Sequence, residues 1–241
     1  KLGASPFVAG LLLVAFGTSI PELFVNARAY AVGAQDLALG NAVGSNIVNF
    51  GLTLGLAAIA APLLVRMRLL SSLLVLLVVA TLALIVFGLD GVVSRVEGVV
   101  MLLAFVAMLA FVLARSGRES IEVRDSIAAF ATTRSALWMN LLRFAVASAL
   151  LYFGARLVVQ SAPMIGASWG LSPLLVGLLP IAIGTALPEV AAAIAAARRG
   201  QGDMVVGHVI GSSLFNLLVV VGGMAALRPL PLPASFVRLE L

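Results

Sequence analysis

Long apolar stretches alternate with short polar connections along almost the whole chain. A helix needs about 20 apolar residues to cross the hydrocarbon core of a membrane. On that length the pattern predicts seven spans, near residues 6–30, 36–61, 69–89, 95–114, 136–162, 172–197 and 203–227. We therefore expect an all-α fold, a polytopic transmembrane helical bundle.

Composition supports this class of protein. Of the 241 residues 62% are hydrophobic and 10% are charged, a surface that a soluble domain of this size could not solvate. The chain has no cysteine, which excludes disulfides and thiolate metal sites. Its net charge of +5 is mostly arginine near the ends of spans, which indicates topology in a lipid bilayer and not nucleic-acid binding. We predict a multi-pass protein of the inner or plasma membrane.

Arginines are distributed unequally between the two sides of the predicted bundle. One side carries Arg66, Arg68, Arg115, Arg118, Arg124, Arg134, Arg198 and Arg199, and the other carries Arg28, Arg95, Arg228 and Arg238. Cytoplasmic connections are enriched in Lys and Arg, so the first side is predicted to be cytoplasmic. Residues 115–135 are then a solvated cytoplasmic loop.

One segment occurs twice, with corresponding residues 167 positions apart. Gly17-Thr18-Ser19-Ile20-Pro21-Glu22 recurs as Gly184-Thr185-Ala186-Leu187-Pro188-Glu189, and Gly44-Ser45-Asn46-Ile47-Val48-Asn49 recurs as Gly211-Ser212-Ser213-Leu214-Phe215-Asn216. Five spans separate the start of one copy from the start of the next. Since five is odd, the copies enter the membrane from opposite sides, and we expect two inverted-topology repeats with a shared site near the midplane.

The first motif combines a predicted helix break with a buried carboxylate. Proline removes an amide donor and glycine loosens the helix, so backbone carbonyls should be freed where they can line a cavity. Thr18 and Glu22 are four residues apart and share a helix face, as do Thr185 and Glu189. A plain proline kink is the alternative, but a glutamate beside the proline in both copies favours a functional site.

The second motif adds hydroxyls and carboxamides, again four residues apart: Ser45 with Asn49, and Ser212 with Asn216. Extending this stripe back by one turn gives Asn41 in the first copy and His208, the one histidine, in the second. Hydrogen bonding between helices is the alternative, and a packed histidine is favoured over a proton relay. Glycines 40, 44, 207 and 211 permit close helix contact, and Asp36 and Asp203 are predicted to be helix N-caps.

Together the two motifs supply hard oxygen donors, which suit calcium or sodium and not zinc or copper. Two buried carboxylates cannot both stay ionised without a counter-charge. One divalent cation neutralises both, and so do several monovalent ions or protons. The sequence therefore predicts that calcium and the monovalent ions or protons compete for the same two carboxylates, and that this competition is the basis of exchange.

These motifs resemble the two alpha repeats of the cation/calcium antiporter superfamily, which holds the sodium/calcium exchangers. The resemblance covers most of the chain and implies ten transmembrane helices and alternating access. It implies Glu22 and Glu189 as calcium carboxylates and no catalytic residue or resident cofactor. Further implied ligands are the side chains of Thr18, Thr185, Ser19, Ser45, Ser212, Asn49 and Asn216 and the backbone carbonyls of Ala15 and Ala182.

The chain departs from the family pattern in three ways. Ala186 stands where Ser19 stands in the other copy, so one hydroxyl ligand is missing and a sodium site is in question. Asn216 occupies a position that is aspartate in some members. Residues 1–114 are expected to form a first repeat without its first helix, and residues 136–241 a second repeat without its last two.

The main prediction is an antiporter that exchanges calcium for sodium. A proton-driven calcium exchanger, kept open by His208 and Ala186, is the alternative within the family. A truncated fragment or scaffold that does not transport is an alternative from another class. An intramembrane hydrolase would need a nucleophile with a base or a metal pair, and no such group is visible in the sequence.

Overall fold

A computed structural model describes residues 16–17, 19–115, 121, 125 and 137–233. Within these residues five helices are long and apolar enough to cross a membrane, or six if a bent pair is one span. The α-helices are α2 (Ile20–Ala31), α3 (Gln35–Val48), α4 (Leu54–Ala60), α5 (Leu69–Phe87), α6 (Arg95–Arg115), α8 (Leu137–Ser168), α9 (Pro173–Val176), α10 (Ala182–Thr185), α11 (Leu187–Arg198), α12 (Gly202–Phe215) and α13 (Gly222–Leu227). The remaining elements are π-helical η1 (Asn49–Thr53), η4 (Gly177–Ile181) and η5 (Asn216–Val221), 3₁₀-helical η2 (Gly88–Asp90), and strands β1 (Val92–Val93) and β2 (Leu230–Pro231).

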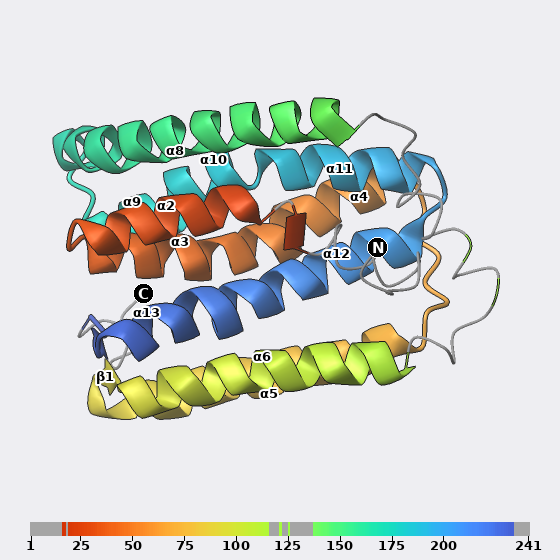
Figure 1. The fold of residues 1–241 in the computed structure, drawn as a ribbon, viewed down its shortest axis with the longest axis horizontal. Helices are drawn as coiled ribbons and strands as arrows, with labels where there is room; N and C mark the ends of the chain where they lie inside the picture. The colour runs from red at the N-terminus through yellow and green to blue at the C-terminus, as the bar shows by residue number, and fades with distance from the viewer. Residues whose placement is uncertain (1–15, 18, 116–120, 122–124, 126–136, 234–241) are drawn as a thin grey trace.

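The repeat in the sequence is also a repeat in the structure. Helices α2 and α11 have the same bounds once 167 positions are subtracted, and so do α3 and α12. Each pair is joined by a turn with a glycine of positive φ, Gly33 at 81° and Gly200 at 72°, a conformation that side chains with a Cβ rarely adopt. The two copies run in opposite directions along the bundle (Figure 1), so the predicted inverted-topology repeats are confirmed.

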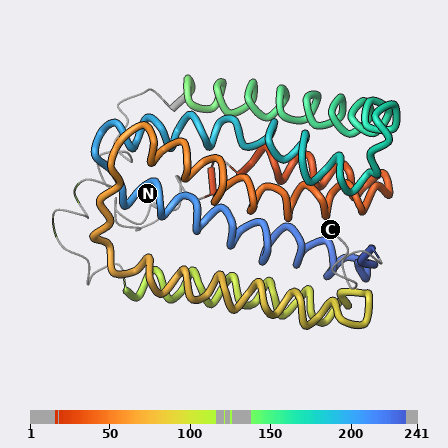
Figure 2. The backbone as a smooth tube through the Cα atoms, turned by 180° about the vertical axis from the view of Figure 1, so that it is seen from behind, coloured from red at the N-terminus to blue at the C-terminus, as the bar shows by residue number. Residues whose placement is uncertain are grey.

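The repeated helices form the centre of the molecule. Figures 1 and 2 show α8 along one edge and the α5–α6 pair along the other, with α2, α3, α11 and α12 between them. The span from α12 through α13 is 83% buried, whereas the span in α8 is 11% buried. The helix of the second repeated motif therefore lies inside protein, and α5, α6 and α8 lie at the edges of the bundle.

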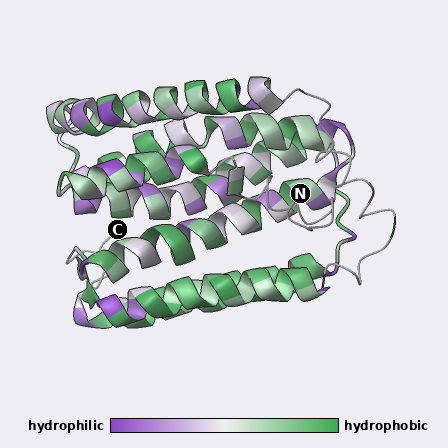
Figure 3. Ribbon diagram, viewed as in Figure 1, coloured by the Kyte–Doolittle hydropathy of each residue, from purple (hydrophilic) through white to green (hydrophobic). Residues whose placement is uncertain are grey.

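Many exposed side chains on the outer helices are large and apolar. Leu82 and Val86 of α5, Leu103 of α6 and Phe144 of α8 are all more than half exposed, and hydrophilic residues gather at the two ends (Figure 3). Such a surface is stable in hydrocarbon and not in water. The predicted transmembrane bundle is confirmed.

One predicted span was too short. The fifth was expected to end at residue 162, but α8 continues through Pro163 to Ser168. Proline removes one amide donor, and a membrane helix tolerates this loss where local adjustment satisfies the freed group. The six other spans correspond to helices in the structure, although the first begins outside the described residues.

Close packing joins the two copies through glycine, as the spacing predicted for Gly40 and Gly44. A Cβ at Gly40 in α3 would run into the backbone oxygen of Leu174, and one at Gly177 into the backbone oxygen of Leu37. At Gly44 the obstacle is the backbone of Leu178. Backbone therefore lies against backbone where α3 crosses α9 and η4, and no larger residue fits there.

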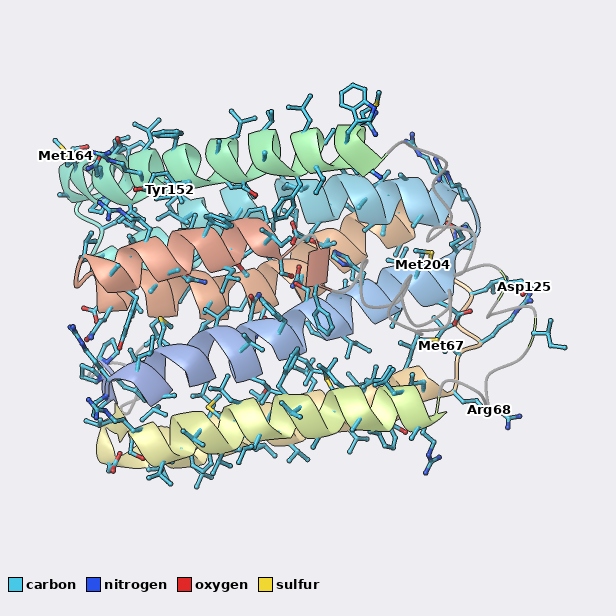
Figure 4. All side chains as sticks on the ribbon, in the orientation of Figure 1. Met67, Arg68, Asp125, Tyr152, Met164 and Met204 are labelled. Carbon is cyan, nitrogen blue, oxygen red and sulfur yellow. The ribbon has the colours of Figure 1, made fainter. Side chains whose placement is uncertain are left out.

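The connections near Arg66, Arg115 and Arg198 lie at one end of the bundle, which we call the arginine-rich end (Figure 1). Here Asp203 does not act as the predicted N-cap, since it lies within α12 and Gln201 is the N-cap residue. Its Oδ1 instead accepts hydrogen bonds of 2.7 Å from the backbone amides of Arg66 and Met67. Figure 4 shows Met67 and Met204 together at this end. Asp203 therefore fixes the α4–α5 connection to the start of α12.

Asp36 is likewise inside α3, and its N-cap prediction is also wrong. At the opposite end of the bundle the corresponding connection is held by other contacts: β1 pairs with β2, and the Leu232 amide donates to the Gly91 oxygen at 2.8 Å. The position equivalent to Arg66 there is Pro233, which has no amide to donate.

Asp203→Ala is expected to destabilise the protein by about 1–3 kcal/mol, because two hydrogen bonds to a carboxylate are lost at a partly exposed site. Thermal unfolding of the detergent-solubilised protein measures this change. Asp36→Ala is the matched control and should unfold close to the wild type. Equal melting temperatures for the two variants would contradict the role assigned to Asp203.

Candidate cation site

Both copies break their helix at the repeated motif. In the second copy α10 ends at Thr185 and α11 begins at Leu187, with an angle of 43° between the two segments. In the first copy α2 begins at Ile20, after a turn at Ser19. Pro21 and Pro188 lie in the first turns of the new helices and cannot donate to the carbonyls four residues earlier. The predicted breaks are therefore present in both copies.

Each break places a glutamate in the first turn of the helix that follows. Glu22 is 1% exposed and Glu189 is fully buried, and the two carboxylates interact electrostatically. Amides at a helix N-terminus favour negative charge, which partly offsets burial. Two neighbouring buried carboxylates still repel each other, so their site requires positive charge.

Buried serines and asparagines from both copies surround the carboxylates. The hydroxyls of Ser19 and Ser212 share a hydrogen bond of 2.7 Å, and Asn49 Nδ2 donates to Ser212 Oγ at 3.1 Å. Asn216 Nδ2 donates to Asn46 Oδ1 at 3.4 Å. Because these bonds join residues of different repeats, they hold the two copies together at the site.

The same bonds leave acceptor oxygens unused. The side-chain amides of Asn49 and Asn216 each donate through Nδ2, while their Oδ1 atoms are buried and have no hydrogen-bond partner among the described residues. Two further oxygens, Glu22 Oε2 and Ser45 Oγ, are also buried and have no hydrogen-bond partner in that part of the chain. Leaving a buried acceptor unsatisfied costs about 1–3 kcal/mol, and a bound cation removes this cost at several oxygens at once.

The site is less symmetric than the sequence repeat. Ser19 pairs with Ser212, but the equivalent of Ser19 is Ala186, which is buried against Val48 and Ala182. Ser45, the equivalent of Ser212, is therefore left without a hydroxyl partner across the interface. The missing hydroxyl noted in the sequence thus has a local structural consequence.

Nine of the eleven predicted ligands fall within the described residues. The side chains of Glu22, Glu189, Ser19, Ser45, Ser212, Asn49 and Asn216 lie in the buried centre, and that of Thr185 is partly buried beside them. The Ala182 carbonyl accepts hydrogen bonds from Ala186 N at 3.1 Å and from Thr185 Oγ1 at 3.3 Å. Thr18 and Ala15 lie outside the described residues. The role of all eleven as ligands stays a prediction.

Asn46 was missed as a functional candidate. Its partner Asn216 is 170 residues away in sequence, so no local pattern predicts the contact. The available signal was its place inside the repeated motif, where Ser213 is the equivalent residue.

The donor set is unlike a transition-metal site. No group of three or more His, Cys, Asp or Glu side chains that could hold a metal ion occurs in the part of the chain that the structure describes. Two carboxylates with carboxamide and hydroxyl oxygens are instead the ligands of hard cations such as calcium and sodium.

Comparison with known proteins gives the class of the chain. Residues 1–114 and 139–241 match the family described as "Sodium/calcium exchanger protein". The chain therefore belongs to the sodium/calcium exchanger protein family and is a multi-pass protein of the cell membrane. The sequence resemblance to cation/calcium antiporters is confirmed.

Individual relatives agree with this class. The chain is 36% identical over 233 residues to the inner membrane protein YrbG of Escherichia coli K12, a match that covers 94% of this chain and 71% of YrbG. It is 28% identical over 265 residues to the sodium/calcium exchanger MaX1 of Methanosarcina acetivorans, covering 95% of this chain and 76% of MaX1.

Among solved structures, the sodium-calcium exchanger NCX_Mj soaked with 2.5 mM Na⁺ and 10 mM Sr²⁺ is similar to this chain. The TM-score is 0.67 at 32% sequence identity, and the match covers 97% of this chain and 75% of that chain.

Proposed function

We propose that the chain exchanges Ca²⁺ for Na⁺ across the membrane by alternating access at the central site. The observation that carries the proposal is a set of buried acceptors that surround two neighbouring carboxylates and have no donor in the part of the chain that the structure describes. In this proposal one Ca²⁺ neutralises Glu22 and Glu189, and Na⁺ ions replace it by taking the same charge. The two ions then cannot occupy the carboxylates together, which couples their movements.

Inverted symmetry supports the alternating step. The helices that follow the two breaks, α2 and α11, run toward opposite ends of the bundle, so the two ends stand in an equivalent relation to the same carboxylates. Sodium as the coupling ion is supported by the carboxamide of Asn216 and by the relatives MaX1 and NCX_Mj, which carry the name sodium/calcium exchanger.

Calcium flux into proteoliposomes tests the proposal, with a sodium gradient or a proton gradient as the only driving force. Flux with sodium alone is the expected result. Flux with protons alone would replace the proposal with a proton-coupled exchanger, for which the buried His208 is the structural candidate. No flux with either gradient would contradict transport by this chain on its own.

Ala186→Ser is expected to raise the apparent sodium affinity of exchange about threefold to tenfold, the effect of one added hydroxyl ligand or hydrogen bond. The new hydroxyl would also supply Ser45 with the partner that Ser19 gives Ser212. The sodium dependence of calcium flux measures the change. Ala197→Ser, at a buried alanine near the end of the same helix, is the control. No change at position 186 would indicate that this residue does not line the site.

A further inference from the structure

Thr53 is a buried threonine near the site that is not among the proposed ligands. It is the last residue of η1 and is fully buried. Its Oγ1 has no hydrogen-bond partner among the described residues. A hydroxyl has one proton and two acceptor lone pairs, and a buried polar group without a partner is costly. The Thr53 oxygen is therefore available to a ligand.

The hydroxyl of Thr53 does not bond back to its own helix. A helical threonine can donate to the carbonyl four residues earlier, as Thr81 Oγ1 in α5 does to the Leu77 oxygen at 2.8 Å. The carbonyl four residues before Thr53 is that of Asn49, which accepts the amide of Leu54 in the wide turn of η1. The π-helical segment thus presents a threonine whose hydroxyl is not used within the helix.

Contacts on both sides of Thr53 show which helices it faces. Asn49, one turn nearer the centre, donates through Nδ2 to Ser212 Oγ of α12 at 3.1 Å. Ala57, one turn nearer the arginine-rich end, packs with Ala193 of α11. Between these two contacts η1 packs against both α11 and α12. Thr53 therefore faces the second copy.

The same register places Thr53 level with Glu189. Helices α4 and α11 both run toward the arginine-rich end (Figure 1). Four residues before Ala57 and Ala193, which pack together, are Thr53 and Glu189. Both of these side chains are fully buried. A hydroxyl oxygen that the helix does not use therefore lies level with a buried carboxylate of the adjacent helix.

The corresponding position in the second copy has no hydroxyl. The equivalent of Thr53 is Val220, which is 3% exposed, and the equivalent of Glu189 is Glu22. Valine has the shape of threonine but offers a methyl group where threonine has its oxygen. This position therefore supplies an oxygen to the surroundings of Glu189 and none to those of Glu22.

The number of bound ions decides which cation benefits from such an oxygen. In the proposed exchange one Ca²⁺ neutralises both carboxylates, so its ligands gather around one point at about 2.3–2.6 Å. Sodium ions that take the same charge occupy separate positions, and each requires oxygens of its own. An oxygen that accompanies one carboxylate therefore serves a sodium ion at Glu189 better than a calcium ion shared with Glu22.

We propose that Thr53 is a specificity-determining residue, whose hydroxyl oxygen binds Na⁺ together with the Glu189 carboxylate and contributes less to Ca²⁺ binding. The inference rests on the proposed function, because it takes Na⁺ as the ion that replaces Ca²⁺. Ala186 removes one hydroxyl from the repeated set, and Thr53 adds one that the second copy lacks.

Displacement of ⁴⁵Ca²⁺ by sodium from the purified chain in detergent tests the inference, with Ca²⁺ held at the Kd of each variant. Thr53→Val is expected to raise the sodium concentration for half-displacement about threefold to tenfold, the effect of one lost polar contact. The Kd for Ca²⁺ without sodium should change less. Thr53→Ser keeps the hydroxyl and should restore displacement. Thr81→Val, which removes a hydroxyl from α5, is the matched control and should behave as the wild type.

Thermal unfolding without Na⁺ or Ca²⁺ separates binding from packing. Because valine leaves no unsatisfied hydroxyl, Thr53→Val should melt at or above the wild-type temperature. Wild-type sodium displacement in Thr53→Val, an equal weakening of both ions, or a lower melting temperature would each overturn the inference while leaving the proposed function intact. If sodium does not displace Ca²⁺ from the wild type, the proposed sodium coupling is contradicted, and the inference with it.

Discussion

Glu22→Gln or Glu189→Gln is expected to abolish calcium transport and to weaken calcium binding by about 100-fold or more, the effect of breaking a buried charge pair. Glutamine keeps the size of glutamate and one acceptor oxygen but removes a full negative charge. A divalent ion would then be neutralised by one carboxylate instead of two. Calcium flux in proteoliposomes and ⁴⁵Ca²⁺ binding in detergent measure the two effects separately.

The matched control is Glu97→Gln. Glu97 lies at the start of α6, where its Oε2 accepts from the Ser94 amide at 2.7 Å and its own amide donates to Ser94 Oγ. This is a capping box, a role that glutamine also fills. Flux should therefore stay near the wild-type level. Unchanged flux in Glu22→Gln or in Glu189→Gln would disprove the central-site hypothesis.

Gly40→Ala is expected to lower the free energy of unfolding by about 3 kcal/mol or more, at the upper end of overpacking effects. The added Cβ would meet the backbone of Leu174 and Leu178, which cannot move aside as the tip of a side chain can. Since α3 crosses α9 and η4 here, relief would require separating the two copies. Thermal unfolding in detergent measures the loss, and calcium binding should fall with it.

Gly55→Ala is the control for this prediction. Gly55 lies inside α4, and its Cβ would meet nothing within 4 Å. Alanine there should be neutral or stabilise the helix by up to about 1 kcal/mol. If the melting temperatures of Gly40→Ala and Gly55→Ala both equal that of the wild type, the close approach of α3 to η4 is not a feature of the protein.

Local chemistry made much of this molecule predictable. The helix breaks follow from proline two residues after the motif serine or alanine, and the positions of Glu22 and Glu189 follow from the breaks. The inverted repeat follows from the constant offset and the odd number of spans. The helix breaks depend on residues only a few positions apart, and the inverted repeat depends on the number of residues and spans between the two copies.

The remaining features depend on partners that are distant in sequence. Asp203 looked like an N-cap because it stands where a turn meets a helix, yet its partners are Arg66 and Met67, more than 130 residues earlier. Asn46 is held to Asn216 across the two copies, and Thr185 to Asn41. Such contacts arise only when the copies dock, so no pattern along one helix predicts them.

The π-helical segments η1 and η5 begin at Asn49 and Asn216, which are equivalent positions in the two copies. The simplest history is that a single ancestral unit already carried this wide turn when its gene was duplicated. In that history the ancestor inserted into the membrane in both orientations and paired with itself, since its two descendants lie in opposite orientations. The copies now differ at Ala186, Ala193 and His208, where the first copy has Ser19, Asn26 and Asn41, so the two halves present different side chains to the centre of the molecule.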